Sequence, residues 1–181
     1  MNVMIVFQSI EGQTAKIARA VGAQATEAGH GVRVVNLAGS DEPPPIDEAD
    51  AVILAASVHE RRHPEVFEIY ITAHRKELEA RKTLLLSVSL KAAFPEGEEE
   101  AGDYLTELKM RTLFEPSAEA LVAGAVRSGA YDYFQSEVLR HVVLREHAYD
   151  PNEGPHEFTD WDSLDRLVGD FLSPAVEAKA G

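Results

Sequence analysis

The sequence predicts an α/β protein built on a doubly wound parallel sheet. Five short apolar runs alternate with amphipathic stretches over most of the chain. An apolar run without polar interruptions is typical of a strand buried on both faces, and parallel sheets consist of such strands. Alternation of strands and helices favours right-handed crossovers that place helices on both faces. With 181 residues, we expect one domain over 1–181.

The individual elements follow from the same periodicity. Behind the first apolar run, a helix with apolar positions at Ile17 and Val21 ends near Gly29. Pro64 suits the first turn of a later helix, and Thr159 is placed to cap the last one. Strands are expected at 1–7, 32–37, 51–56, 83–89 and 120–126. Helices are expected at 14–28, 64–81, 101–114 and after Thr159, and polar loops at 40–50 and 91–102.

Residues 128–159 interrupt this alternation between the fifth strand and the last helix. Apolar positions between Tyr131 and Val143 predict one amphipathic helix inside the stretch. We interpret the stretch as an insertion, and its apolar stripe predicts that it covers the active site or a partner surface.

Composition excludes several classes of function. The net charge is −14, from 31 acidic against 17 basic residues, which argues against nucleic acid and against electrostatic adhesion to anionic lipid. The chain has no cysteine, so disulfides, thiolate nucleophiles and Cys-ligated metals are excluded. Apolar runs are too short to span a bilayer, and no basic leader precedes them. We expect a cytoplasmic protein; the oligomeric state is left open.

The turn after the first strand is a candidate anion site. It reads Ser9-Ile10-Glu11-Gly12-Gln13-Thr14 and opens a helix. Gly12 lets the backbone approach a ligand, and the helix start presents unpaired N–H groups, so a phosphate is the natural occupant. The turn lacks the glycines of a dinucleotide fingerprint and the lysine of a triphosphate loop, which favours a monophosphate. The alternative is an ordinary helix start, capped by Ser9 or Thr14.

Ligands of doubly wound sheets bind beyond the carboxyl ends of the strands. The loops at that edge are expected at 9–14, 57–63, 89–94 and 127–133. Although the chain is short of cations, these loops carry Arg61, Arg62, Lys91 and Arg127. Loops at this edge usually hold the site, so we interpret the four cations as part of a functional rim.

Three other interpretations are weaker. A phosphoacceptor domain needs an aspartate at the end of the third strand, where the chain has Ala56 and Ser57. A serine hydrolase needs a Gly-x-Ser-x-Gly elbow, which is absent. His59 and His63 are four residues apart, but Pro64 disfavours a helix through both, so no metal site is predicted. Trp161 has helical spacing with leucines and is interpreted as core, not as a flavin-stacking ring.

The turn at 9–14 resembles the FMN phosphate loop of flavodoxins in its hydroxyl-x-acid-Gly-Gln-Thr form. The whole chain is similar to the menaquinone-dependent protoporphyrinogen dehydrogenase (protoporphyrinogen oxidase) family, the flavodoxin-like enzymes of haem biosynthesis. The matching stretches span nearly the full length in the family's order: 7–14, 56–58, 87–90, 122–127, 131–146 and 158–161.

This resemblance implies a flavodoxin-like sheet with strand order 2-1-3-4-5 and an FMN cofactor. It also implies removal of six electrons from protoporphyrinogen, passed in pairs to a quinone. Carried over by position, the phosphate loop comprises Ser9, Ile10, Glu11, Gly12, Gln13 and Thr14. The isoalloxazine ring would lie between Ser57, Val58 and His59 on one side and Ser89, Leu90 and Lys91 on the other.

A planar substrate with two propionates suits an open flavin face with arginines nearby, because guanidinium pairs with carboxylate. Arg61, Arg62 and Arg127 are the expected substrate-binding residues, and no catalytic residue is named because the flavin performs the redox step. The insertion is mixed in charge, so peripheral contact with the inner face of the cell membrane and the choice of quinone stay open. The alternative is a flavodoxin-type electron carrier, which the acidic charge favours.

Overall fold

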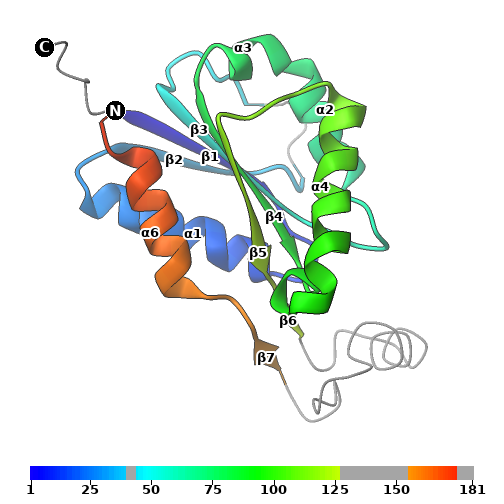
Figure 1. Ribbon diagram of the computed structural model, residues 1–181. Coiled ribbons are helices and arrows are strands. Elements are labelled where there is room, and N and C mark those ends of the chain that lie inside the picture. Colours follow the sequence, from blue (N-terminus) through cyan, green and yellow to red (C-terminus); the bar gives the residue numbers. More distant parts are fainter. Residues whose placement is uncertain (40–43, 127–154, 175–181) are drawn as a thin grey trace, which may run out of the picture.

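The computed structural model describes residues 1–39, 44–126 and 155–174, and a five-stranded parallel sheet forms its centre (Figure 1). The strand order β2-β1-β3-β4-β5 confirms the predicted doubly wound fold. The strands are β1 (Asn2–Gln8), β2 (Gly31–Asn36), β3 (Ala51–Ser57), β4 (Lys82–Ser89) and β5 (Ala118–Ala123). Every pairing between neighbours is parallel, so all five carboxyl ends meet at one edge.

Helices cover both faces of the sheet, as Figure 1 shows. On one face lie α1 (Gln13–Glu27) and α6 (Trp161–Leu172), and on the other lie α2 (Glu65–Ala73), α3 (Arg75–Glu79) and α4 (Glu98–Thr112). Ile17 of α1 and Val168 of α6 are fully buried in the first layer, and Phe67 of α2 and Leu108 of α4 in the second.

The solid apolar runs form strands because both of their faces are covered. In β3, every residue from Ala51 to Ala56 has an exposed fraction of 0%. Successive side chains point to opposite faces, so Ile53 joins the core under α1 and α6, while Leu54 joins the core under α2 and α4. Two apolar layers thus hold the sheet rigid, and its carboxyl edge is a fixed platform for loops.

The chain leaves the sheet earlier than the sequence predicts. We expected the fifth strand to reach Val126, but β5 ends at Ala123, and Gly124 donates its N–H to Ser89 O at 3.0 Å. The next two residues form β6 (Ala125–Val126), which pairs antiparallel with β7 (His156–Glu157). We call β6 and β7 together the stem. The stem arises because Phe158 N–H binds the carbonyl of Gly124.

The insertion predicted at 128–159 falls largely outside the described residues, and so does its predicted helix at 131–143. Its limits and the single domain over 1–181 stay predictions.

Three boundaries differ from expectation. The helix predicted at 64–81 divides at His74, whose backbone leaves helical geometry, into α2 and α3. The polar loop predicted at 91–102 holds two short 3₁₀ turns, η1 (Lys91–Ala93) and η2 (Pro95–Gly97), and α4 already begins at Glu98. Asp160, not Thr159, caps α6, since its carboxylate accepts the Ser163 N–H at 3.0 Å.

Candidate functional site

The turn between β1 and α1 has the geometry of an anion site. Gly12 is the residue before α1 and has φ +97°, a left-handed conformation that suits glycine. Its N–H donates to Ser9 Oγ at 3.0 Å, which closes the turn, and no side chain caps the helix. The hydroxyl of Thr14, on a residue only 1% exposed, has no hydrogen-bond partner among the described residues. The turn therefore offers helix N–H groups and a buried hydroxyl to a ligand.

Two further buried oxygens without partners in the described part of the chain lie close to this turn in the fold. They are Gln8 Oε1 at the end of β1 and Ser57 Oγ at the end of β3. Buried polar atoms are normally hydrogen-bonded, so unpaired ones at the carboxyl edge of adjacent strands indicate a polar ligand. The residues present at this edge fit a phosphorylated cofactor.

Gln13 has a different role in the fold from its neighbours in the turn. Its side-chain amide donates to Glu157 Oε2 and to Thr159 Oγ1, both at 2.9 Å. Thr159 in turn donates to the carbonyl of Ala123 at 2.7 Å. The side chain of Gln13 thus joins the turn to the stem, and its backbone N–H belongs to the helix start.

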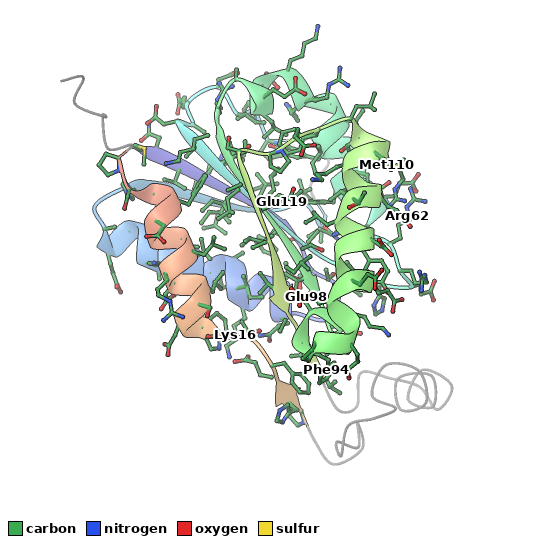
Figure 2. All side chains as sticks on the ribbon, viewed as in Figure 1. Lys16, Arg62, Phe94, Glu98, Met110 and Glu119 are labelled. Carbon is green, nitrogen blue, oxygen red and sulfur yellow. The ribbon has the colours of Figure 1, made fainter. Side chains whose placement is uncertain are left out.

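Glu157 makes further contacts between the stem and α1. Its partner Lys16 is labelled in Figure 2 at the same end of the molecule as the stem, and two side chains bind Glu157 besides Gln13. Its carboxylate lies 2.6 Å from Lys16 Nζ and accepts Trp161 Nε1–H at 2.7 Å. Burial alone would raise the pKa of Glu157, but the hydrogen bonds from Lys16, Trp161 and Gln13 outweigh it and lower that pKa to about 2. Sequence reasoning missed Glu157, because two of its partners, Lys16 and Gln13, lie 141 and 144 residues earlier.

The loop after β3 forms a tight two-residue turn. His59 and Arg62 exchange backbone hydrogen bonds of 2.9 and 3.0 Å, and the intervening Glu60 and Arg61 have φ of 47° and 65°. Left-handed backbone at two successive non-glycine residues is costly, and such strain persists only where surrounding contacts hold it. His59 Nε2 lies 3.6 Å from Glu11 Oε1, so this turn and the β1–α1 turn are neighbours.

The loop after β4 packs against the stem. Ser89 is buried, and its hydroxyl accepts the N–H of Ala92 at 3.2 Å. Leu90 contacts a small apolar cluster centred on Phe94 and Val126. The ring of Phe94 meets that of Phe158 edge-on at 5.2 Å, and Phe94 is labelled beside the stem in Figure 2. The predicted ring-binding residues Ser89, Leu90 and Lys91 therefore lie on a loop that packs against the stem.

The predicted cations are held by carboxylates. Arg61 and Lys91 both pair with Glu100. Arg62 forms two hydrogen bonds to Glu68, which also binds Arg111 at 2.9 Å. Arg127 lies outside the described residues.

Glu68 is buried between its two arginines. Burial alone would raise its pKa, but the hydrogen bond from Arg62 and the charge of Arg111 together lower it. Its contacts also turn the guanidinium of Arg62 toward the α2–α4 face, where both arginines line a groove of about 350 Å³.

The histidine pair does not converge on one point. His59 is exposed beside Glu11, whereas His63 is buried and its Nε2 lies 3.0 Å from Ser87 Oγ. Within 1–39, 44–126 and 155–174, no group of three or more potential metal ligands is present. Trp161 packs partly buried against the core under α1 and α6, in agreement with its interpretation as core.

These observations define a class of protein. A parallel sheet in order 2-1-3-4-5 carries an anion-binding turn after β1 and two loops at the same edge. A model of the flavodoxin domain matches residues 4–152, so the chain belongs to the flavodoxin domain family. Membership of this family confirms FMN as the cofactor and identifies the chain as a flavoprotein.

Among characterised proteins, the chain is similar to protoporphyrinogen IX dehydrogenase [quinone] of Escherichia coli K12. The two are 24% identical over 165 residues, which cover 91% of each. The predicted resemblance is confirmed at this level.

Two solved structures share the fold. Oxidised flavodoxin 1 from Bacillus cereus superposes with a TM-score of 0.56 at 15% identity, covering 95% of this chain and 97% of that one. Two-electron reduced flavodoxin of Megasphaera elsdenii has a TM-score of 0.50 at 20% identity, covering 66% and 84%. No helix in the described part of the chain is both long and apolar enough to cross a membrane.

Proposed function

We propose that this flavoprotein is an FMN-dependent oxidoreductase that dehydrogenates protoporphyrinogen and passes the electrons to a quinone. The observation that carries the proposal is the end-to-end match to protoporphyrinogen IX dehydrogenase, which covers 91% of both chains. The oxidation removes six electrons and six protons from the porphyrinogen. Each quinone accepts two of each, so three quinones become quinols for every porphyrin formed.

The cofactor is assigned to the carboxyl edge of the sheet. The N–H groups at the start of α1 and the hydroxyl of Thr14 bind the phosphate, while Ser9 and Gly12 shape the turn. The ring lies between the loops at 57–59 and 89–91. FMN, when bound there, supplies two-electron chemistry. The protein contributes orientation, and no side chain is assigned as an acid or base.

Of the three predicted arginines, Arg61 is the best supported substrate ligand. It uses Nη1 on Glu100, but its side chain is 69% exposed and a guanidinium has five donors. A propionate can therefore pair with Arg61 without displacing Glu100. Arg62 is bound to Glu68, and Arg127 is proposed from its place in the sequence alone.

An anaerobic assay tests the activity. FMN-loaded protein is mixed with protoporphyrinogen and menadione, and porphyrin fluorescence is followed. We expect a rate well above the uncatalysed background, with three equivalents of menadione consumed per porphyrin. Absence of such a rate in protein whose flavin a reductase reduces normally would contradict the proposal.

The phosphate assignment has its own test. Replacing Thr14 by Ala removes a buried hydroxyl, and a hydrogen bond to a charged group contributes about 1.5–3 kcal/mol. We therefore expect Thr14→Ala to weaken FMN binding about tenfold or more, with riboflavin, which lacks the phosphate, almost unaffected. Gly12→Val, which forces a β-branched residue to φ +97°, should act in the same direction. Fluorescence titration measures both, and equal losses for the two flavins would contradict a phosphate role.

The competing function is an electron carrier that shuttles between redox proteins. The observation in its favour is the net charge of −14, which suits a basic protein partner. A carrier would reduce or oxidise such a partner at a rate that falls steeply with salt, and it would show no porphyrinogen turnover.

A further inference from the structure

One carboxylate joins the two loops assigned to the flavin ring. Glu100, in the first turn of α4, receives hydrogen bonds from three side chains. Arg61 comes from the tight turn after β3, Lys91 from η1 after β4 at 2.8 Å, and Tyr104 from the next turn of α4. Glu100 thus forms ion pairs with both loops.

The chain brings α4 unusually close to η1 at this point. Gly97 immediately precedes α4, and a Cβ there would lie 2.4 Å from the carbonyl oxygen of Lys91. Only glycine allows this approach, because real Cβ atoms do not come that near to backbone oxygen. The first turn of α4 is therefore held against η1, and Glu100 lies within reach of Lys91.

The same cluster supports the strained turn after β3. Arg61 has φ +65°, and its guanidinium lies 5.6 Å from the centre of the Tyr104 ring. Tyr104 is itself 4% exposed, so its ring is a fixed surface. An arginine in left-handed backbone is thus fastened at its far end by the Tyr104 ring and by Glu100.

The carboxylate stays charged in this setting. Hydrogen bonds from Lys91 and then Tyr104 lower the pKa of Glu100, and burial only partly opposes them.

We propose that Glu100 is a positioning residue that fixes the spacing of the loops at 57–62 and 89–91 and thereby sets the affinity for the flavin ring. The proposal rests on the assignment of the ring to these loops. Glu100 acts through Arg61 and Lys91 and does not itself touch the cofactor.

The test compares Glu100→Gln, Glu100→Asp and the matched control Glu99→Gln. Glu99 is exposed in the same helical turn and forms no ion pair or hydrogen bond among the described residues, so its substitution changes the charge equally without altering a contact. Glu100→Asp keeps the charge but shortens the side chain by one methylene, which prevents it from spanning both cations. Each variant is titrated with FMN and with riboflavin by fluorescence quenching.

We expect Glu100→Gln and Glu100→Asp to bind both flavins about tenfold more weakly than wild type, with the FMN-to-riboflavin affinity ratio unchanged. Glu99→Gln should stay within about twofold of wild type. A purely electrostatic role predicts the opposite, because removing a negative charge favours the anionic phosphate and tightens FMN alone. That result would overturn the proposal, as would wild-type affinity in Glu100→Asp.

Two controls separate the possible failures. Far-UV circular dichroism on heating establishes that each variant is folded, and Glu100→Asp carries the test if Glu100→Gln does not fold. A wild-type protein that binds both flavins but does not oxidise protoporphyrinogen refutes the proposed function only. The effect of Glu100 on flavin affinity is then still measured and decided.

Discussion

His63 is a buried histidine with only half of its hydrogen-bonding capacity satisfied. The residue is 1% exposed, its Nε2 contacts Ser87, and its Nδ1 has no partner in the described part of the chain. Burial lowers the pKa of His63 to about 4, with the nearby Glu68 opposing and Arg111 adding to the shift. The ring is therefore neutral at pH 7 and packs against Phe67.

This histidine predicts a pH dependence of stability. Its pKa is about 4 in the folded state and about 6.5 in the unfolded state, so the unfolded chain binds more protons between these values. The contribution of the neutral His63 ring to the free energy of unfolding is complete above about pH 6.5. It is lost as the pH falls toward 4, at about 1.4 kcal/mol per pH unit and about 3 kcal/mol in total. Urea unfolding at pH 7.5 and pH 5 measures it.

The matched variant is His63→Gln, which can still reach Ser87 but does not titrate. We expect the free energy of unfolding of the wild type to fall between pH 7.5 and pH 5 by about 2 kcal/mol more than that of the variant. Parallel pH profiles for the two proteins would contradict this explanation.

At the scale of elements, the β1–α1 turn is bound to the start of α6. Gln13 contacts both Glu157 and Thr159, and the hydroxyl of Thr159 is shared between the Gln13 amide and the carbonyl of Ala123. These contacts connect the β1–α1 turn, β5 and the stem. The first turn of α1 is thus oriented by residues about 145 positions later in the chain.

Replacing Thr159 by Val tests this connection. The side chains have the same shape, but Val cannot bond the Ala123 carbonyl or the Gln13 amide, which keeps its hydrogen bond to Glu157. One buried polar group left unpaired costs about 1–3 kcal/mol, so we expect the free energy of unfolding to fall by about 1–3 kcal/mol. Thr106→Val on the exposed face of α4 is the control, and it should stay within about 0.5 kcal/mol of wild type.

FMN affinity provides a second measurement on the same pair. Because Thr159 contacts the turn to which we assign the phosphate, Thr159→Val should weaken the binding of FMN more than that of riboflavin. A variant that is destabilised but binds both flavins normally would show that the contact serves folding alone.

The elements that could be predicted are those governed by local pattern. The runs that form β1, β3 and β4 are mostly apolar because both faces are buried, and that signal lies within each run. The division at His74 and the short η1 and η2 turns are governed by packing between elements, which periodicity does not record. The stem depends on pairing between residues about 30 positions apart, for which two-residue strands carry no signature.

For the whole molecule, the sequence predicts a position for the candidate site but not the contacts that support it. Gly12 and Thr14 are recognisable because a glycine and a hydroxyl at a helix start have a specific physical use. Glu100 and Glu157 looked like ordinary acids of a strongly acidic chain. Each has partners on more than one other segment of the chain, and only the fold brings those together.

The charges near the candidate site also differ between what the sequence predicts and what the structure shows. Although the net charge is −14, the sequence predicts a group of cations at the site. In the structure, Arg61, Arg62 and Lys91 each bind a carboxylate, so the local charge near the loops is lower than a count of cations indicates. Under the proposed function, a propionate at Arg61 would share this cation with Glu100.

The stem also allows the segment between β6 and β7 to be replaced by another. Val126 and His156 are paired, so the two ends of the segment between them lie at adjoining backbone positions. The stem already holds together the ends of any segment placed between them. Doubling the length of that segment raises the entropic cost of closing the loop by only about 0.6 kcal/mol. Neither β5 nor α6 would need to move. We therefore expect that a foreign segment can be grafted between Val126 and His156 without a change in the sheet or in the β1–α1 turn.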